Sequence, residues 1–450
     1  MLAVVLLLLV AQGASNQADA RLAPLIQLLE IPTPHGDKIV GACAGDSHLA
    51  FLTRRGRLLT AGSNRFGQLG RSSAEAQPAE HMLLEAREVE VQEAGTPVPG
   101  SEHLRERLQR GREAESEPLL SFACGPLSTA VVARHRPYTF GDNSNFQLGR
   151  ATTVGQMDRK PRPIELDVTH LQRRGFGLIA PSLRFELVGV SEYIGAAVTS
   201  SGQLYIWGAR EEGDEHAGGE DGGGGSWHAR RAQLELLRDE AVVQLVVGSA
   251  HVLVRTSAGR LLSAGDNDVG QLGRATGEDE PFDSLQQLHR PFHAIKYADV
   301  SSIELHTVAL AQDGSVCSWG DNSALQLGRQ LDDSEHREAF AERPGWVVLR
   351  GILDERTGEK VTAVSAGRSH TVVLTSTGSI IGWGSNEVGQ LGIQMERGSE
   401  KGSTQKQEPL RRRGGREDGG RRERGSDKVR GESGKSFKES GRNPGGEGRV

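Results

Sequence analysis

With 450 residues, the chain is long enough for one large domain with a sizeable core or for two ordinary domains. Its formal net charge of −6 is uneven, because residues 401–450 hold 15 Lys and Arg against 8 Asp and Glu, a net +7 that leaves −13 for residues 1–400. An acidic body argues against a folded part that follows a phosphate backbone, so the basic tail is the better candidate for nucleic-acid binding.

The chain begins with a continuous apolar run at residues 2–10, followed by an Ala-Asp-Ala sequence at residues 18–20 that resembles a signal-peptide cleavage site. The run is too short to span a bilayer as a helix. No Lys or Arg precedes Arg21, so the basic start of a signal peptide and the Arg-rich pattern of a transit peptide are both missing. Three interpretations stay open for residues 1–31: a strand of a partial repeat, a signal peptide or membrane anchor, and an organelle-targeting segment.

Six later segments share a framework of about 20 residues, the strongest signal in the sequence. In its complete form, a Gly-x-x-His sequence is followed by two short apolar runs and then by Gly-Gln-Leu-Gly. The first, fourth and sixth copies have the complete framework, and the second and fifth keep most of it. The third copy has lost the Gln-Leu-Gly sequence and also the Asn that, in the other copies, stands two residues after the glycine at the end of the second apolar run. The repeat positions are Gly45, His48, Gly62, Gly70, Gly141, Gly149, Gly208, Gly248, His251, Gly265, Gly273, His306, Gly320, Gly328, Gly367, His370, Gly384 and Gly392.

The apolar runs predict β-hairpins. Residues 48–53, 251–256 and 370–375 are rich in apolar and β-branched residues, and each run leads to a short turn that contains glycine. A period of about 60 residues with several short strands predicts one four-stranded sheet per repeat. Because such a sheet cannot bury both of its faces alone, the sheets are expected to stack as blades around a common axis, as an all-β propeller.

This pattern resembles the RCC1 repeat of the regulator of chromosome condensation family, over residues 32–393. The resemblance implies a seven-bladed propeller, of which six blades are recognised; residues 1–31 are the candidate for a partial seventh. It also implies protein partners bound across one face, small GTPases among them, and, for the founding member, guanine-nucleotide exchange. The β-wedge loop that performs exchange in that family does not map residue by residue onto any insert of this chain.

Three inserts interrupt the repeats. Residues 72–118 are charged and partly helical in pattern, residues 209–226 are acidic and glycine-rich, and residues 330–360 include Trp346 in an expected strand, 345–353. We interpret the inserts as surface loops that the fold tolerates or as parts of a binding face. Residues 394–450 form an Arg- and Gly-rich tail that cannot pack.

The sequence predicts no catalytic, cofactor-binding or metal site. The four repeat histidines should lie in a circle, one to a blade, rather than in a cluster. Cys43 and Cys124 fall at the same place in two repeats and, with Cys317, are expected to be small buried residues; an odd number without a framework favours a reducing compartment.

The sequence therefore favours a protein-interaction scaffold that has no chemistry of its own. The alternatives are guanine-nucleotide exchange on a small GTPase and a chromatin- or RNA-associated regulator that uses the tail. A cytoplasmic or nuclear location is expected, or a secretory or organellar one if residues 1–20 are a targeting signal.

Overall fold

The computed structural model describes residues 37–71, 87–89, 119–150, 157–165, 183–208, 229–236, 239–277, 280–331, 339–354, 356–387 and 389–391. All of them belong to one compact unit, Met1–Arg412. The expectations for residues 1–31, for the insert at 209–226 and for the tail at 394–450 lie outside the described residues. So do most of the insert at 72–118 and the repeat position Gly392.

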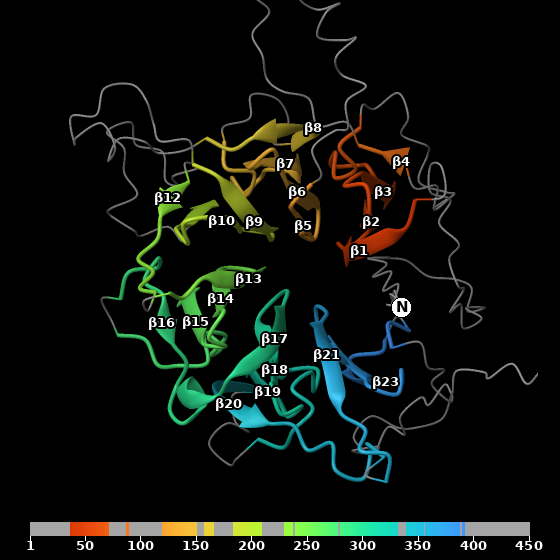
Figure 1. The fold of residues 1–450 in the computed structure, drawn as a ribbon, viewed down its shortest axis with the longest axis vertical. Coiled ribbons are helices and arrows are strands. Elements are labelled where there is room, and N and C mark those ends of the chain that lie inside the picture. Colours follow the sequence, from red (N-terminus) through yellow and green to blue (C-terminus); the bar gives the residue numbers. More distant parts are fainter. Residues whose placement is uncertain are drawn as a thin grey trace, which may run out of the picture. The chain divides into compact units, whose positions relative to one another are not determined.

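The described residues form an all-β propeller of six antiparallel blades around a common centre (Figure 1). Blade 1 is β1 (Ile39–Ala44), β2 (His48–Thr53), β3 (Leu58–Gly62) and β4 (Arg87–Glu88). Blade 2 is β5 (Ser121–Cys124), β6 (Ser128–Ala133), β7 (Arg136–Asp142) and β8 (Met157–Pro163). Blade 3 is β9 (Phe185–Val190), β10 (Ile194–Thr199), β11 (Leu204–Gly208) and β12 (Arg230–Arg231).

Blade 4 is β13 (Val242–Val247), β14 (His251–Thr256), β15 (Leu261–Gly265) and β16 (Gln286–Gln287). Blade 5 is β17 (Tyr297–Ser302), β18 (His306–Ala311), β19 (Val316–Asp321) and β20 (Phe340–Trp346), with the 3₁₀ turn η3 (Phe292–Ala294) before it. Blade 6 is β21 (Val361–Ala366), β22 (His370–Thr375) and β23 (Ile380–Gly384), three strands within the described part of the chain. In every blade the first strand lies nearest the centre (Figure 1).

The predicted hairpins are confirmed, and their bounds agree with the sequence pattern. The strands β2, β14 and β22 begin at the repeat histidine and end at Thr53, Thr256 and Thr375. Each histidine is paired with the glycine that ends the third strand, as His48 is with Gly62. Gly62 has φ +108°, and a Cβ on it would lie 2.4 Å from the carbonyl oxygen of Ser47. Only glycine fits there, which explains why a glycine stands at this position, at or next to the end of the third strand, in all six copies.

Consecutive blades pack through a recurring pair of residues. The last glycine of the Gln-Leu-Gly loop lies against an aromatic ring on the third strand of the next blade. The pairs are Gly70 with Phe140, Gly149 with Trp207, Gly273 with Trp319, and Gly328 with Trp383. Each indole also donates a hydrogen bond back to the carbonyl oxygen of the preceding blade's glutamine, at 2.8 to 2.9 Å. The repeat therefore specifies the interface between blades as well as the blade itself.

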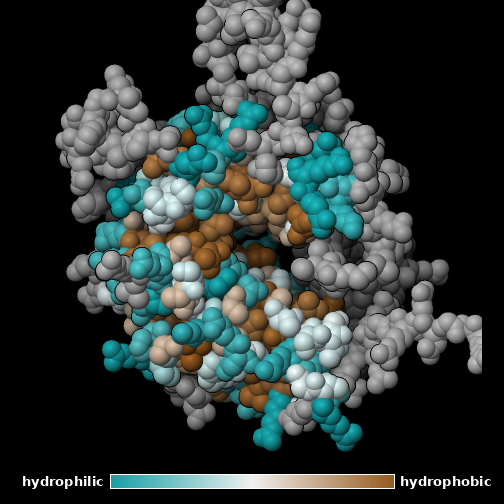
Figure 2. Space-filling model, in the orientation of Figure 1, coloured by the Kyte–Doolittle hydropathy of each residue, from teal (hydrophilic) through white to brown (hydrophobic). Residues whose placement is uncertain are grey.

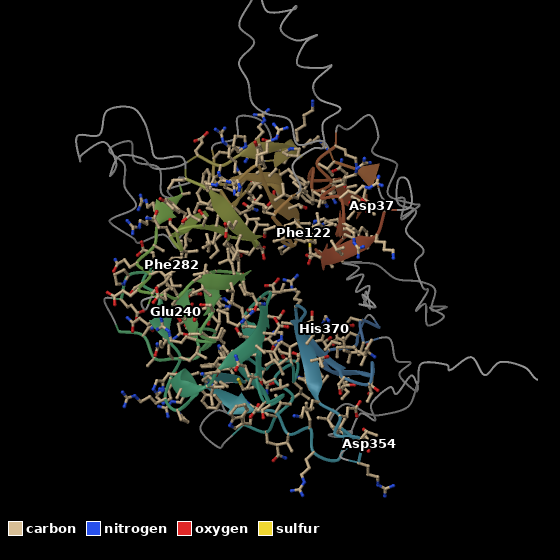
Figure 3. The ribbon with its side chains drawn as sticks, viewed as in Figure 1. Asp37, Phe122, Glu240, Phe282, Asp354 and His370 are labelled. Carbon is tan, nitrogen blue, oxygen red and sulfur yellow. A yellow bond between two sulfur atoms is a disulfide. The ribbon has the colours of Figure 1, made fainter. Side chains whose placement is uncertain are left out.

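Hydrophobic side chains gather toward the middle of the ring, and hydrophilic ones predominate at its rim (Figure 2). Phe122 of β5 lies near the centre and Asp354 lies at the outer edge (Figure 3). None of the helices within the described ranges is long and apolar enough to cross a membrane.

Two expectations about the inserts are wrong where the structure describes them. Arg87 and Glu88, inside the pattern taken as partly helical, form the strand β4, because their backbone pairs with the edge of β3. The strand expected at 345–353 lies earlier, at Phe340–Trp346, so Trp346 ends it rather than begins it. The fourth strand of a blade is therefore set by the free edge of the third strand and not by its own residues.

The cysteine prediction holds for Cys317 alone. Cys317 is buried, with no exposed surface, and is a free thiol. Cys43 and Cys124 are joined in a disulfide bond instead of lying apart as small buried residues. The two cysteines also occupy different repeat positions. Cys43 pairs across its hairpin with Ala50, two residues after the first residue of β2, whereas Cys124 pairs with Thr129, one residue after the first residue of β6.

Candidate functional site

Six short turns between the first and second strands surround the centre of the propeller at one face, and we call them the axial turns. They are residues 45–47, 125–127, 191–193, 248–250, 303–305 and 367–369. Neighbouring axial turns are hydrogen-bonded to each other. The Asp46 N–H donates to the Pro126 carbonyl at 3.0 Å, and the Ser249 N–H donates to the Glu304 carbonyl at 3.0 Å. These bonds hold the axial turns of adjacent blades in register.

Arg368 links the last blade to the first across this face. Its guanidinium lies 3.7 Å from the carboxylate of Glu304 in blade 5 and 4.0 Å from that of Asp46 in blade 1. The Arg368 side chain remains 64% exposed, whereas that of Glu304 is only 14% exposed. A guanidinium that is shared between two carboxylates and open to solvent stays available to a third anionic or aromatic group.

The axial turns carry more negative than positive charge. Asp46, Glu192 and Glu304 are their acidic residues, and Arg368 is the one basic residue among them. Burial raises the pKa of Glu304; Arg368 opposes this rise, and the charges of Glu192 and Asp46 add to it. Burial also raises the pKa of Asp46, against the effect of Arg368. The carboxylates are therefore close enough to repel one another, and one guanidinium does not neutralise them.

Apolar side chains are exposed on the same face. Tyr193 and Ile303 belong to axial turns and are 39% and 36% exposed. Leu325, in the Gln-Leu-Gly loop of blade 5, is 64% exposed. Tyrosine and arginine are enriched at the centres of protein–protein interfaces, and this face carries one of each in its axial turns, Tyr193 and Arg368.

The loops around the axial turns are fixed by their own side chains. In blade 2, the Asn143 amide oxygen accepts from the Leu148 N–H at 2.8 Å, and its NH₂ group donates to the Arg150 carbonyl at 2.9 Å. Gln147 donates to the Asp142 carboxylate at 2.8 Å. Asn267 and Asn322 accept the same bond in blades 4 and 5. The face is therefore a rigid platform, which lowers the entropic cost of binding a partner.

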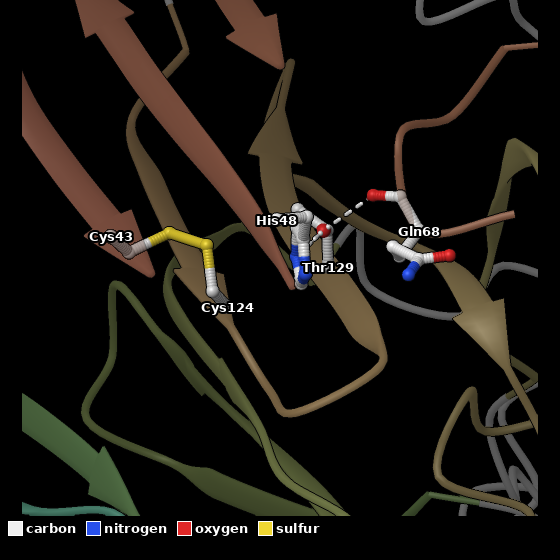
Figure 4. The surroundings of a disulfide bond; sticks show 5 residues. All are labelled: Cys43, His48, Gln68, Cys124 and Thr129. Carbon is white, nitrogen blue, oxygen red and sulfur yellow. Dashed lines mark hydrogen bonds between the residues drawn. A yellow bond between two sulfur atoms is a disulfide. The ribbon is translucent and has the colours of Figure 1, made fainter. Parts of the chain in front are cut away.

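Below the axial turns, three of the repeat histidines join adjacent blades. His48 lies 2.9 Å from the Thr129 hydroxyl of blade 2 (Figure 4), and His306 lies 3.0 Å from the Thr371 hydroxyl of blade 6. His251 makes the corresponding contact with Ser302 of blade 5, at 3.0 Å. Each of these three histidines contacts a different blade, as expected if the repeat histidines are arranged in a circle with one in each blade.

The hydrogen bonds fix which nitrogen of these rings carries the proton. The Thr129 hydroxyl donates its only proton to the Gln68 carbonyl at 2.9 Å, so it accepts from His48. The His48 Nε2 is therefore protonated, and its Nδ1 has no hydrogen-bond partner within the described ranges. Thr371 and Ser302 donate to carbonyls in the same way, which gives His306 and His251 the same tautomer.

Burial lowers the pKa of all four repeat histidines, because a charged imidazole loses its hydration. Within the described residues, the ring nitrogen without a hydrogen-bond partner is Nδ1 in His48, His251 and His306 and Nε2 in His370. The pKa falls to about 4 for His48 and His370 and to about 3 for His251 and His306. The His251 and His370 rings lower that of His306 further. At neutral pH these residues are uncharged.

Replacing Thr129 with valine tests the histidine contact. The change keeps the shape of the side chain but leaves the His48 Nε2–H and the Gln68 carbonyl without a partner. We expect T129V to lower the free energy of unfolding by about 2 to 3 kcal/mol, measured by urea denaturation. The matched control, T362V at an exposed strand position, should cost less than about 0.5 kcal/mol. Equal effects of the two changes would contradict the contact.

The structure places the predicted repeat positions in a framework around the axial turns. Gly45, Gly248 and Gly367 lie directly over the imidazole rings, since a Cβ on Gly367 would be 1.8 Å from His370. The repeat glycines of the third strands have positive φ, and so do the described glycines of the Gln-Leu-Gly loops, Gly70, Gly149, Gly273 and Gly328. Across the described ranges, no three His, Cys, Asp or Glu side chains lie close enough together to hold a metal ion.

Sequence reasoning missed the residues that give the face its chemistry. Asp46, Ser249 and Arg368 each follow the repeat glycine directly and stand two residues before the repeat histidine. In these three copies the position is Asp, Ser or Arg, whereas the residue before it is always Gly and the residue after it is Ser or Ala. A variable residue between two repeated ones is the signal that would have identified the axial turns.

Models of one repeat family match the chain. Residues 39–68, 242–271 and 361–390 match the regulator of chromosome condensation (RCC1) repeat, and residues 313–374 match a second model with the same description. The matched segments include the first, fourth and sixth axial turns.

Curated relatives share most of the propeller. Protein pim1 of Schizosaccharomyces pombe is 26% identical over 291 residues, 64% of this chain and 51% of that protein. The probable E3 ubiquitin-protein ligase HERC6 of Homo sapiens is 31% identical over 291 residues, 63% of this chain and 25% of that protein. The chain thus spans about half, or less, of these relatives.

Solved structures share the fold. Human WBSCR16 matches with a TM-score of 0.55 and 18% identity, over 78% of this chain and 77% of that one. Prp20p of Saccharomyces cerevisiae, which was solved with a description of its binding to Gsp1p and histones, matches with a TM-score of 0.54 and 17% identity. That match covers 77% of this chain and 72% of Prp20p.

Proposed function

Because this chain is an RCC1-repeat propeller protein, we propose that it is a protein-binding scaffold and that the axial turns form its binding surface. The observation that carries the proposal is the composition of those turns. Three carboxylates, one exposed guanidinium and the exposed side chains of Tyr193 and Ile303 lie together on a rigid platform. Such a surface combines electrostatic steering with apolar contact area.

The charge of the axial turns selects the chemistry of the partner. A partner with Lys or Arg side chains would neutralise the carboxylates that Arg368 leaves unpaired. It would also lower the raised pKa values of Asp46 and Glu304. We therefore expect a basic surface or segment on the bound protein, with an association rate that falls as salt is added.

Charge reversal at the axial turns tests the proposal. E192K should weaken binding of the native partner at least tenfold, because it places a cation where the partner's own cation binds. The matched control is D313K, which makes the same change at an exposed position in the β18–β19 turn, on the opposite face. Proximity labelling in the native cell identifies the partner, and titration of the purified pair gives the dissociation constants. Equal losses in the two variants would overturn the axial turns as the surface.

A second candidate is guanine-nucleotide exchange on a small GTPase. It is supported by the structure of Prp20p, a propeller of the same fold that is described with its binding to Gsp1p. Exchange needs no catalytic group of its own; the protein must only bind the nucleotide-free GTPase more tightly than the nucleotide-bound form. A panel of GTPases loaded with fluorescent nucleotide distinguishes the two functions. Accelerated release of the nucleotide from one GTPase supports exchange. If no GTPase of the panel releases its nucleotide faster, the scaffold function is favoured.

A further inference from the structure

The disulfide between Cys43 and Cys124 joins the innermost strands of two different blades. Cys43 is in β1 and Cys124 is in β5, with Cα atoms 5.6 Å apart (Figure 4). That separation lies in the range that a disulfide spans without movement of the backbone. Both residues are half-buried, whereas Cys317 has no exposed surface. A small thiol can therefore approach this pair but not the third cysteine.

The register of the strands explains why these two cysteines meet. Because Cys43 and Cys124 are one position apart in the repeat, their side chains point to opposite faces of their blades. Cys43 faces forward to blade 2, and Cys124 faces back to blade 1. Had they occupied the same repeat position, both would point the same way around the ring and could not bond.

The same two positions meet at other blade interfaces, which shows that the contact belongs to the propeller. Between blades 3 and 4 they are Gly189 and Val247, and a Cβ on Gly189 would lie 2.4 Å from the valine side chain. Between blades 5 and 6 they are Ser301 and Ala366, where the alanine N–H donates to the serine hydroxyl at 2.9 Å. Cysteines at both positions are therefore held side by side by the packing of the blades.

We propose that Cys43 and Cys124 form a thiol–disulfide site that locks blade 1 to blade 2 when it is oxidised and releases the blade when it is reduced. Cys43 precedes Asp46 by three residues, and Cys124 precedes Pro126 by two. Asp46 and Pro126 are hydrogen-bonded to each other in the axial turns. The bond thus controls the order of this sector of the axial turns, whether or not that face binds a partner.

Glutathione disulfide is the oxidant that balances the reaction. One cysteine thiolate attacks a sulfur of glutathione disulfide and releases one glutathione thiolate. The second cysteine then attacks the mixed disulfide and releases the other. Cys43 and Cys124 together give up two electrons and two protons, and the oxidant becomes two molecules of glutathione. Excess glutathione runs the exchange in reverse.

Peptide mapping tests whether the site forms. The full chain is equilibrated with excess glutathione disulfide or with excess glutathione, alkylated, and digested with trypsin. After oxidation, a disulfide should link the peptides of residues 39–54 and 113–134, and it should be absent after reduction. C317S should give the same linked pair. If the linked pair never forms, the proposal is overturned.

Amide exchange tests whether the bond locks the blade. Reduction should speed exchange of the Asp46 amide at least tenfold, because only the hydrogen bond to Pro126 then holds it. The Ser249 amide, which makes the corresponding bond between blades 4 and 5, is the internal control and should not change. Reduction should also lower the thermal midpoint by about 5 to 10 °C.

The double variant C43S/C124S should behave as the reduced protein in both buffers. If the linked peptides form but the Asp46 amide and the thermal midpoint are the same in both redox states, the lock is overturned. None of these readouts involves a partner, so they fail or succeed independently of the proposed binding function.

Discussion

Between pH 7 and pH 5 the protein should lose about 7 kcal/mol of its free energy of unfolding. That loss is as large as the whole stability of many domains, which is about 5 to 15 kcal/mol. The cause is the set of four buried histidines, His48, His251, His306 and His370, whose pKa lies at about 3 to 4 in the folded protein. We therefore expect the propeller to unfold in mild acid.

The direction follows from where the protons bind. In the unfolded chain a histidine has a pKa of about 6.5 and takes up a proton as the pH falls through that value. In the folded protein the same residues stay neutral until about pH 4 or below. The stability they contribute is therefore complete above pH 6.5 and is lost as the pH falls toward their folded pKa. Each histidine costs about 1.4 kcal/mol per pH unit within that window.

Urea denaturation at a series of pH values measures the effect. The slope of the unfolding free energy against pH gives the number of protons taken up on unfolding, and we expect about four near pH 5.5. H306Q removes one titrating ring and should lower that number by about one, whatever it does to stability at pH 7.5. An uptake of fewer than two protons in the wild-type protein would show that the histidines are not held neutral.

The strands of this propeller were predictable because local and tertiary requirements coincide in the repeat. The glycine at position 62 is needed for φ +108° and also for the close approach of Ser47. Such doubly constrained residues mark the ends of strands in the sequence. By contrast, Arg87 and Glu88 form a strand only because the edge of β3 is free to pair, and nothing in their own chemistry shows it.

The disulfide escaped prediction for a different reason. Placing Cys43 and Cys124 at the same repeat position requires an alignment error of only one residue, but one residue reverses the face of a strand. With the correct register, the two thiols point toward each other across a blade interface. The axial turns escaped for the opposite reason: their residues differ between copies, so periodicity alone passes over Asp46 and Arg368.

The interface between blades predicts the largest effect of a single substitution. Trp319 of blade 5 has no exposed surface, lies against Gly273 of blade 4, and donates a hydrogen bond to the Gln271 carbonyl at 2.9 Å. W319A should lower the free energy of unfolding by about 3 to 5 kcal/mol, because it opens a cavity at the interface and leaves that carbonyl unpaired. W319F keeps most of the ring and should cost about 1 to 2 kcal/mol.

Trp346 provides the matched control, since it ends β20 in the same blade but is 43% exposed. Its ring contacts the Phe292 ring, with ring centroids 5.2 Å apart, and because so much of the Trp346 side chain is in solvent, W346A should cost about 1 kcal/mol or less. Urea midpoints of the three variants decide the matter. If W319A and W346A lower the stability equally, the indole does not hold blades 4 and 5 together. The packing of the blades would then depend on aliphatic contacts. The recurring contact between a loop glycine and the aromatic ring of the next blade would not contribute to stability.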